Sequence, residues 1–140
     1  MDFSQEFNRI MAHQTDIALA TSVQDIPNVR IVNFYYDPQK KGVLFFSTER
    51  NNLKVTEFQA NSNVAFSTIP AQENEHVRVH RGVIEKSKLG IGDLKDAFIK
   101  KVPDYEMVID AMGHLLDVYE IHFKEAMVTI DFTQSEKVTF

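Results

Sequence analysis

Short segments with the pattern of β-strands follow one another along this chain, with few helical segments between them. Seven segments show strand alternation or a run of β-branched and aromatic residues: 16–23, 29–36, 43–48, 64–69, 76–86, 117–123 and 125–132. Parallel strands in sequence need helical crossovers, so we expect a mostly antiparallel sheet. Closure of such a sheet removes its exposed edges. The predicted fold class is therefore mostly β, an antiparallel barrel of about six to seven strands with accessory helices.

Three segments have helical patterns, and turn residues separate the first strands. The helices are predicted over 4–14, 52–60 and 87–113, and the turns over 24–28 and 37–42. The ends of these helices are predicted from capping and helix-breaking residues. Ser4 and Asn51 or Asn52 are expected as N-caps and Asp93 as a possible cap, while the third helix is expected to break at Pro103, restart at Asp104 and end at Gly113. The last two strands are expected to form a hairpin at Lys124-Glu125.

The bulk composition narrows the classes of function. The chain of 140 residues favours one domain spanning 1–140. It has no Cys, which excludes disulfides, thiolate-bound zinc, iron–sulfur clusters and cysteine nucleophiles. A net charge of −5 disfavours nucleic acid as a partner. The first residues do not resemble a secretory signal, and no apolar run is long enough for a membrane helix, so we expect a cytoplasmic protein with no membrane partner.

The segment from Phe45 to Lys54 is the most informative about chemistry. Here a strand ends in hydroxyls and a polar loop opens a helix, with six polar residues close together: Ser47, Thr48, Arg50, Asn51, Asn52 and Lys54. The positive end of a helix, hydroxyls and an ammonium group suit a phosphate monoester. The alternative is a capped helix start with solvated basic residues. A phosphate site and a simple helix cap both remain open at this point.

Arg30 stands inside an apolar strand, where it shares a face with Val32, Phe34 and Tyr36. A buried Arg needs an anionic partner. That partner could be a phosphate or a carboxylate, unless the side chain lies at the rim of the sheet.

A third polar group lies on the strand over 76–86. His76, Arg78 and His80 alternate onto one face, with Val77, Val79 and Val83 on the other. A polar outer face or a subunit interface explains this pattern as well as a ligand site does. Two His four apart on a strand are a weak zinc motif, and no metal site is predicted. No nucleophile elbow, Walker loop or dinucleotide fingerprint is present, and Gly90-Ile91-Gly92 is interpreted as a loop.

Taken in order, these segments resemble the pyridoxamine 5'-phosphate oxidase-like split-barrel family over residues 10–132. The matching features are a strand with an Arg, a strand ending in hydroxyls, a helix carrying a Lys and the strand from Glu75 to Gly82, with Glu125–Val128 resembling the final barrel strand. The resemblance implies a homodimer that binds flavin mononucleotide (FMN) at its interface. The implied cofactor-binding residues are Arg30, Ile31, Val32, Asn33, Phe46, Ser47, Thr48, Asn52, Leu53, Lys54, His76 and Arg78. The strand from Glu75 to Gly82, with His76 and Arg78, resembles the one that contributes to the flavin ring site in the family, often across the dimer.

The chain departs from true pyridoxamine-phosphate oxidases. It has no Trp and no Arg after Arg81, so their substrate clamp is not visible. It looks more like the short, general members of the family. The resemblance therefore implies an FMN-dependent oxidoreductase of unknown substrate and electron donor, with no catalytic side chain assigned. The alternatives are a flavin or haem carrier or sensor using His76, His80, His114 or His122, a deazaflavin-dependent reductase, and a structural β-barrel dimer without a ligand.

Overall fold

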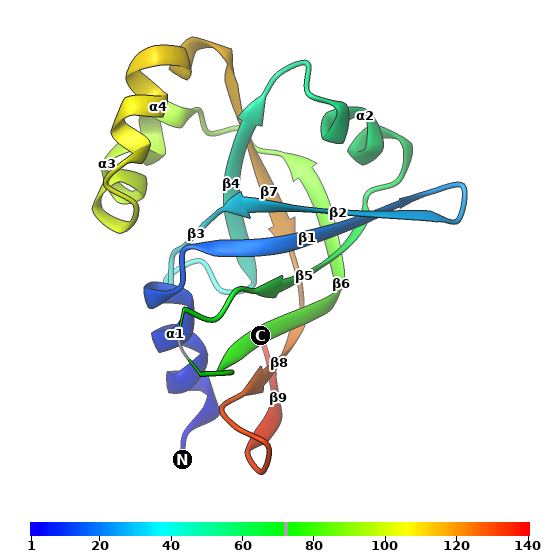
Figure 1. Cartoon of the computed structure of the whole chain (residues 1–140), viewed down its shortest axis with the longest axis vertical. Coiled ribbons are helices and arrows are strands. Elements are labelled where there is room, and N and C mark those ends of the chain that lie inside the picture. The colour runs from blue at the N-terminus through cyan, green and yellow to red at the C-terminus, as the bar shows by residue number, and fades with distance from the viewer. Residues whose placement is uncertain (72) are drawn as a thin grey trace.

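The computed structural model describes residues 1–71 and 73–140, and within them the strands belong to one antiparallel sheet (Figure 1). The strands are β1 (Asp16–Val23), β2 (Ile26–Asn33), β3 (Tyr35–Tyr36), β4 (Val43–Glu49), β5 (Asn63–Thr68), β6 (His76–Lys86), β7 (Leu116–His122), β8 (Glu125–Thr129) and β9 (Ser135–Thr139). The helices are α1 (Phe3–His13), α2 (Leu53–Ala60), α3 (Ile91–Lys101) and α4 (Tyr105–Met112), with a 3-10 turn at Gly113–Leu115. The predicted mostly β, antiparallel class is confirmed.

A break at Phe34 divides one extended segment into β2 and β3, which lie at the two ends of the strand order. The order β2-β1-β5-β6-β7-β4-β3 returns to its start, because only Phe34 separates β2 from β3. Before this residue the chain pairs with β1, as Asn33 does with Asp16, and after it the chain pairs with β4, as Tyr35 does with Phe45. Phe34 is fully buried, and its N–H donates to the carbonyl oxygen of Thr15 at 3.1 Å. On the N-terminal side of the break, β2 crosses β4 without pairing with it in the described residues (Figure 1).

The long strand β6 joins the two halves of the sheet. Its edge away from β5 pairs with β8 over 76–78 and with β7 over 83–86. On the β5 side the register slips by one residue, because Val64 pairs with Gly82 but Phe66 pairs with Val79. This bulge reverses the alternation, so Gly82 and Ile84 face inward and Val83 faces outward. The prediction that Val83 shares the buried face of Val77 and Val79 was therefore wrong.

The C-terminal pairing also differs from the prediction. β7 and β8 do not form a hairpin with each other; β8 pairs with β9, a strand that the sequence analysis missed. The first turn is shorter than predicted, because Gln24 and Asp25 take positive φ values of 52° and 65° and β2 begins at Ile26. Two such residues suit the twist of a tight hairpin.

The helix ends show which predicted caps form. Asp2, not Ser4, caps α1, and its carboxylate accepts from the N–H of Ser4 at 2.9 Å. Asn52 caps α2 as predicted. Gly90 is the N-cap of α3, and Ile91 and Gly92 belong to the helix rather than to a loop; the N–H of Gly90 donates to the Asp93 carboxylate at 2.8 Å. Gly113 has φ of −54° and continues into a 3-10 turn instead of stopping the chain.

Phenylalanines dominate the interior. Eight of the eleven are buried: Phe7, Phe34, Phe45, Phe46, Phe58, Phe66, Phe98 and Phe123. Most belong to a cluster inside the barrel that α1 closes at one end. Phe45 and Phe98 belong to a second cluster, in which α3 and α4 cover the outer face of β4 and β7. Core packing, as expected, accounts for most of these rings.

Replacing Gly42 with alanine is expected to lower the free energy of unfolding by about 1–3 kcal/mol. Gly42 has φ of 76°, and an added Cβ would lie 2.5 Å from the carbonyl oxygen of Phe123. Gly92 is the matched control, because a Cβ there meets nothing within 4 Å and Ala favours its helix. Urea unfolding of both variants checks this, and equal stabilities for the two would contradict it.

Candidate functional site

A cavity of about 270 Å³ lies in the side of the barrel where β2 and β4 separate. We call it the Lys54 cavity. Its walls come from β2, from the end of β4, from the start of α2 and from α4, and they comprise Ile31, Val32, Asn33, Ser47, Thr48, Glu49, Asn52, Lys54, Tyr105, Val108, Met112 and Leu116. Seven of these were predicted from the sequence: Ile31, Val32, Asn33, Ser47, Thr48, Asn52 and Lys54. The fold thus brings three separate segments to one place.

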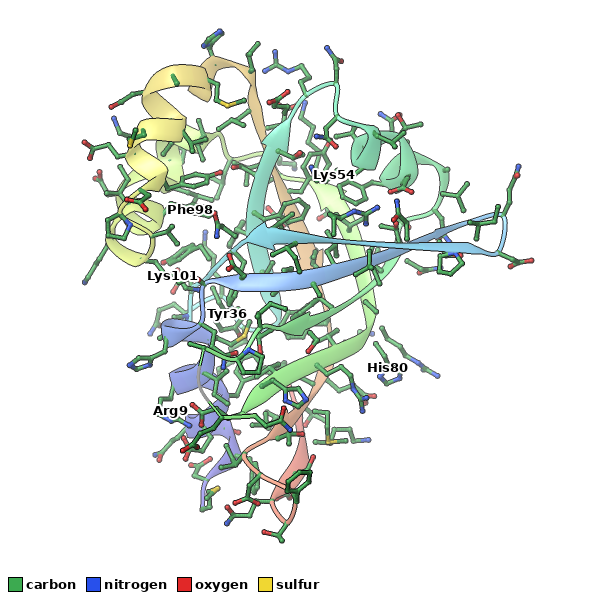
Figure 2. All side chains as sticks on the ribbon, in the orientation of Figure 1. Arg9, Tyr36, Lys54, His80, Phe98 and Lys101 are labelled. Carbon is green, nitrogen blue, oxygen red and sulfur yellow. The ribbon has the colours of Figure 1, made fainter. Side chains whose placement is uncertain are left out.

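The polar end of this cavity is built at the start of α2 (Figure 2). The ammonium group of Lys54 donates to the hydroxyl of Thr48 at 2.8 Å, and the side chain of Asn52 accepts from the N–H of Lys54 at 3.1 Å. Burial lowers the pKa of Lys54, and the charge of Arg30 lowers that pKa further, while Glu49 opposes both. An anion bound beside Lys54 would favour its charged form.

Arg30 does not line the cavity. Its guanidinium forms an ion pair with Glu57 of α2 and donates to the hydroxyl of Thr21 at 3.0 Å and to the carbonyl oxygen of Leu19 at 3.2 Å. Both charged side chains are mostly buried, with 17 % of each exposed. Of the partners that the sequence left open, the structure therefore supplies a carboxylate. Arg30 therefore affects the cavity through its positive charge, which lowers the pKa of Lys54.

The opposite wall is apolar and comes from α4. Tyr105, Val108 and Met112 follow one another at helical spacing on the face that meets the cavity. The hydroxyl of Tyr105 is hydrogen-bonded to that of Ser47, and burial raises the pKa of Tyr105 to about 12, so the phenol is neutral. This wall was not predicted from the sequence. The spacing of the three residues was visible, but nothing indicated which strand the helix would cover.

The wall of the cavity that β2 forms is fixed by pairing with β1. The side-chain amide of Asn33 donates to the carboxylate of Asp16, so this amide is committed to β1. Ile31 has 59 % of its surface exposed. This wall therefore offers backbone and apolar surface to a ligand.

Besides Arg30, four predicted residues lie outside the cavity. Phe46 is fully buried in the barrel core, and Leu53 is exposed at the first position of α2. His76 and Arg78 lie on β6 and line no part of the Lys54 cavity in the same chain. The Nδ1–H of His76 donates to the carbonyl oxygen of Asn74 at 2.7 Å. The predicted contact of His76 and Arg78 with a flavin ring requires a second copy and stays a prediction.

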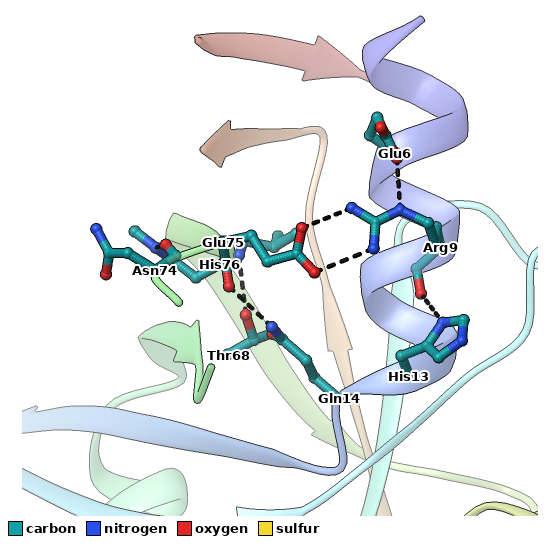
Figure 3. A network of polar contacts seen from close by, with 9 residues as sticks. Glu6, Arg9, His13, Gln14, Thr68, Asn74, Glu75 and His76 are labelled. Carbon is teal, nitrogen blue, oxygen red and sulfur yellow. Dashed lines mark hydrogen bonds and ion pairs between the residues drawn. The ribbon is translucent and has the colours of Figure 1, made fainter. Parts of the chain in front are cut away.

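The strand that carries His76 is anchored to α1 (Figure 3). The neighbouring Glu75 receives two hydrogen bonds from Arg9, at 2.7 and 3.0 Å, and its backbone oxygen accepts from the side chain of Gln14 at 2.8 Å. The Arg9 guanidinium also holds the pKa of Glu75 below its usual range. The start of β6 is thus fixed in place, although its polar face is open to solvent.

The histidines proposed as haem ligands are spread over the surface. His80 points away from the barrel (Figure 2). The Nε2 atom of His122 lies 2.8 Å from a carboxylate oxygen of Glu120 and 3.0 Å from one of Glu85. Three possible metal ligands are therefore close together here, and the sequence could not indicate this because they come from two strands.

The barrel with an opening in its side defines a split-barrel protein. The sequence model of the family described as pyridoxamine 5'-phosphate oxidase-like matches residues 10–135. The chain therefore belongs to the pyridoxamine 5'-phosphate oxidase-like family.

Solved structures with this fold include proteins that are named for different ligands. General Stress Protein 26 from Bacillus anthracis has a TM-score of 0.74 and 17 % identity, and the match covers 100 % of both chains. A FAD-binding protein from Mesorhizobium loti has a TM-score of 0.65 and 16 % identity over 88 % of this chain and 89 % of that one. A heme binding protein from Mycobacterium smegmatis has a TM-score of 0.77 and 14 % identity, and the match covers 99 % of this chain but 58 % of that one.

At these identities the structures show a shared fold. A search of curated proteins finds no match. Within residues 1–71 and 73–140, no helix is long and apolar enough to cross a membrane.

Proposed function

We propose that this protein binds FMN in the Lys54 cavity and is an oxidoreductase. The observation that carries the proposal is the convergence of Lys54, Thr48 and Asn52 at the start of α2, next to the open wall of β2. Family membership and the FAD-binding relative support a flavin as the ligand.

The residues present fit a flavin phosphate. A partly buried ammonium group, a hydroxyl and the start of a helix suit a phosphate dianion, and the charge of Arg30 adds to the attraction. The apolar residues Val108 and Met112 would exclude water from one side. A bound flavin would supply the electron-transfer chemistry, while the protein binds and orients it. The substrate and electron donor are not part of the proposal.

The size of the cavity supports a homodimer. Its 270 Å³ is below the range of about 300–1,000 Å³ that holds a whole ligand, so a second surface would complete the site. The strand β2 exposes Ile26, Val29 and Ile31, with 70, 61 and 59 % of their surfaces accessible. Apolar side chains on an edge strand are typical of an interface. We propose that β2 meets a second copy there.

A lysine at Val29 is expected to shift a dimer toward monomer, because the charge would be buried in the interface. Sedimentation velocity at several protein concentrations measures the shift. Phe132→Lys is the control, since Phe132 is fully exposed in the turn between β8 and β9. A wild-type monomer, or a Val29→Lys dimer as stable as wild type, would contradict the proposed interface.

The flavin proposal is tested on purified full-length protein. We expect a yellow protein that releases FMN on denaturation, or a colourless one that binds added FMN with one equivalent per chain. Competition with deazaflavin and addition of haemin, followed by absorption spectra, test the alternatives. A protein that does not bind FMN would contradict the proposal. A haem spectrum that is lost on His122→Ala would favour a haem carrier.

A further inference from the structure

A second, larger cavity lies at the other end of β4 and β7. We call it the Arg81 cavity; its volume is about 600 Å³. In the pairing of these strands, Val43 and His122 border the Arg81 cavity, whereas Glu49 and Leu116 border the Lys54 cavity. The two pairs are six positions apart along the strands, which is about 20 Å at roughly 3.3 Å per residue. The two cavities are therefore separate sites.

The wall of the Arg81 cavity is apolar because of two features of the fold. The bulge in β6 turns Val83 outward, where 48 % of its surface is exposed, and Val83 and Val43 both line the cavity. Phe140 forms another part of the wall, and its N–H donates to the carbonyl oxygen of Lys124 at 2.9 Å. The ring of Phe140 packs against Phe7 with centroids 4.8 Å apart. Phe140 is thus fixed in the wall by its backbone hydrogen bond to Lys124 and by its contact with the core residue Phe7.

Three cations surround this wall. Lys41, Arg81 and Lys124 line the cavity, and none of them has an ion-pair partner among the residues that the structure describes. Unpaired cations gathered at one cavity contrast with the net charge of −5 of the whole chain. Apolar surface surrounded by cations attracts an anion that also has an apolar part.

The carboxylates near the cavity already have partners. Glu125, which also lines it, lies 3.6 Å from the ammonium group of Lys137. Glu85 and Glu120 both face the Nε2 atom of His122. Lys41, Arg81 and Lys124 are thus the charged residues of the lining that have no ion-pair partner in the described part of the chain.

We propose that the Arg81 cavity binds a small organic anion, with the apolar part of the ligand against Val83 and Phe140 and the acidic group facing Arg81, Lys41 and Lys124. A volume of 600 Å³ lies within the range for small-molecule sites. The inference does not rest on the proposed flavin function. It adds a second ligand site to the chain, for a substrate or an effector that carries a carboxylate, sulfonate or phosphate group.

The test uses two probes of nearly the same shape. Anilinonaphthalene sulfonate carries the acidic group, and phenylnaphthylamine lacks it. Titration of the full-length protein, with and without FMN, is expected to show one site per chain for the sulfonate and weaker binding of the neutral probe. Arg81→Ala is expected to weaken sulfonate binding about tenfold, the effect of losing a hydrogen bond to a charged group.

Two further variants separate the parts of the proposal. Val83→Trp fills the cavity from a half-exposed position and should abolish binding of both probes without disturbing the core. Lys40→Ala is the matched control, because Lys40 does not line the cavity and its ammonium lies 5.3 Å from the centroid of the Phe45 ring. It should leave both affinities unchanged.

The outcomes are distinguishable from those for the flavin site. FMN affinity should be the same in wild type and Val83→Trp, and a protein that fails to bind FMN leaves this proposal standing. Equal affinities for the two probes, or sulfonate binding that survives both variants, would overturn it. So would a dimer that binds no probe because a second copy covers the cavity.

Discussion

Replacing Lys54 with alanine is expected to weaken the binding of FMN roughly 10- to 100-fold and to leave the binding of riboflavin unchanged. The ammonium group of Lys54 is partly buried beside Thr48, where a phosphate oxygen would replace or share its hydrogen bond. A hydrogen bond between charged groups contributes about 1.5–3 kcal/mol, which gives this range. Riboflavin has no phosphate and would not use the contact. Fluorescence titration with both flavins measures the difference.

Lys54 is a better test of the phosphate site than Arg30. Removing Arg30 would leave Glu57 buried without its ion-pair partner, and loss of folding would be confused with loss of binding. Lys88→Ala, at an exposed position, controls for the loss of one positive charge. Lys54→Arg should retain part of the affinity. If Lys54→Ala and Lys88→Ala bind FMN equally well, the phosphate is held elsewhere.

Raising the pH from 7 to 9 is expected to stabilise the protein by up to about 2 kcal/mol through Lys101 alone. The ammonium group of Lys101 donates to the carbonyl oxygen of Met11 at 2.8 Å and lies 3.4 Å from the centroid of the Phe34 ring. Burial lowers the pKa of Lys101 to about 7, although Asp16 opposes the shift. Between pH 7 and the ordinary lysine pKa, the unfolded chain therefore holds a proton that the folded chain has released. Stability rises with pH across this window.

Urea unfolding at pH 7 and pH 9 measures this contribution. Lys101→Met keeps the length of the side chain but removes the titrating group, so its stability should rise less between the two pH values, by about 2 kcal/mol. Lys100→Met is the matched control, since the neighbouring Lys100 is exposed and should keep the wild-type dependence. An identical pH response in Lys101→Met and wild type would show that the Lys101 amine stays charged in the folded protein.

The sequence pattern predicted those parts of the Lys54 cavity that come from a single continuous segment. The cap at Asn52 and the nearness of Thr48 to Lys54 depend on a strand end, a short loop and a helix start, which are adjacent in sequence. Glu57 as the partner of Arg30 could not be predicted, because 27 residues separate them and the sequence offers many carboxylates.

The register of the strands could not be predicted from the sequence either. A bulge adds one residue to β6 and moves Val83 to the outer face, and no residue type in His80-Arg81-Gly82 marks that shift unambiguously. The strand β9 was missed because Ser135–Thr139 has one buried residue, Val138, and little apolar alternation. Its partner β8 also pairs with β6, so only the tertiary structure places this hairpin.

The break at Phe34 has a consequence for how the protein behaves without a ligand. It leaves β2 and the end of β4 with backbone groups that no strand in the described part of the chain satisfies, next to the exposed side chains of Val29 and Ile31. Such edges can recruit a strand from another molecule. Ligand-free protein should therefore be the form most prone to aggregate during synthesis or storage. Occupation of the opening would then protect solubility as well as supply chemistry.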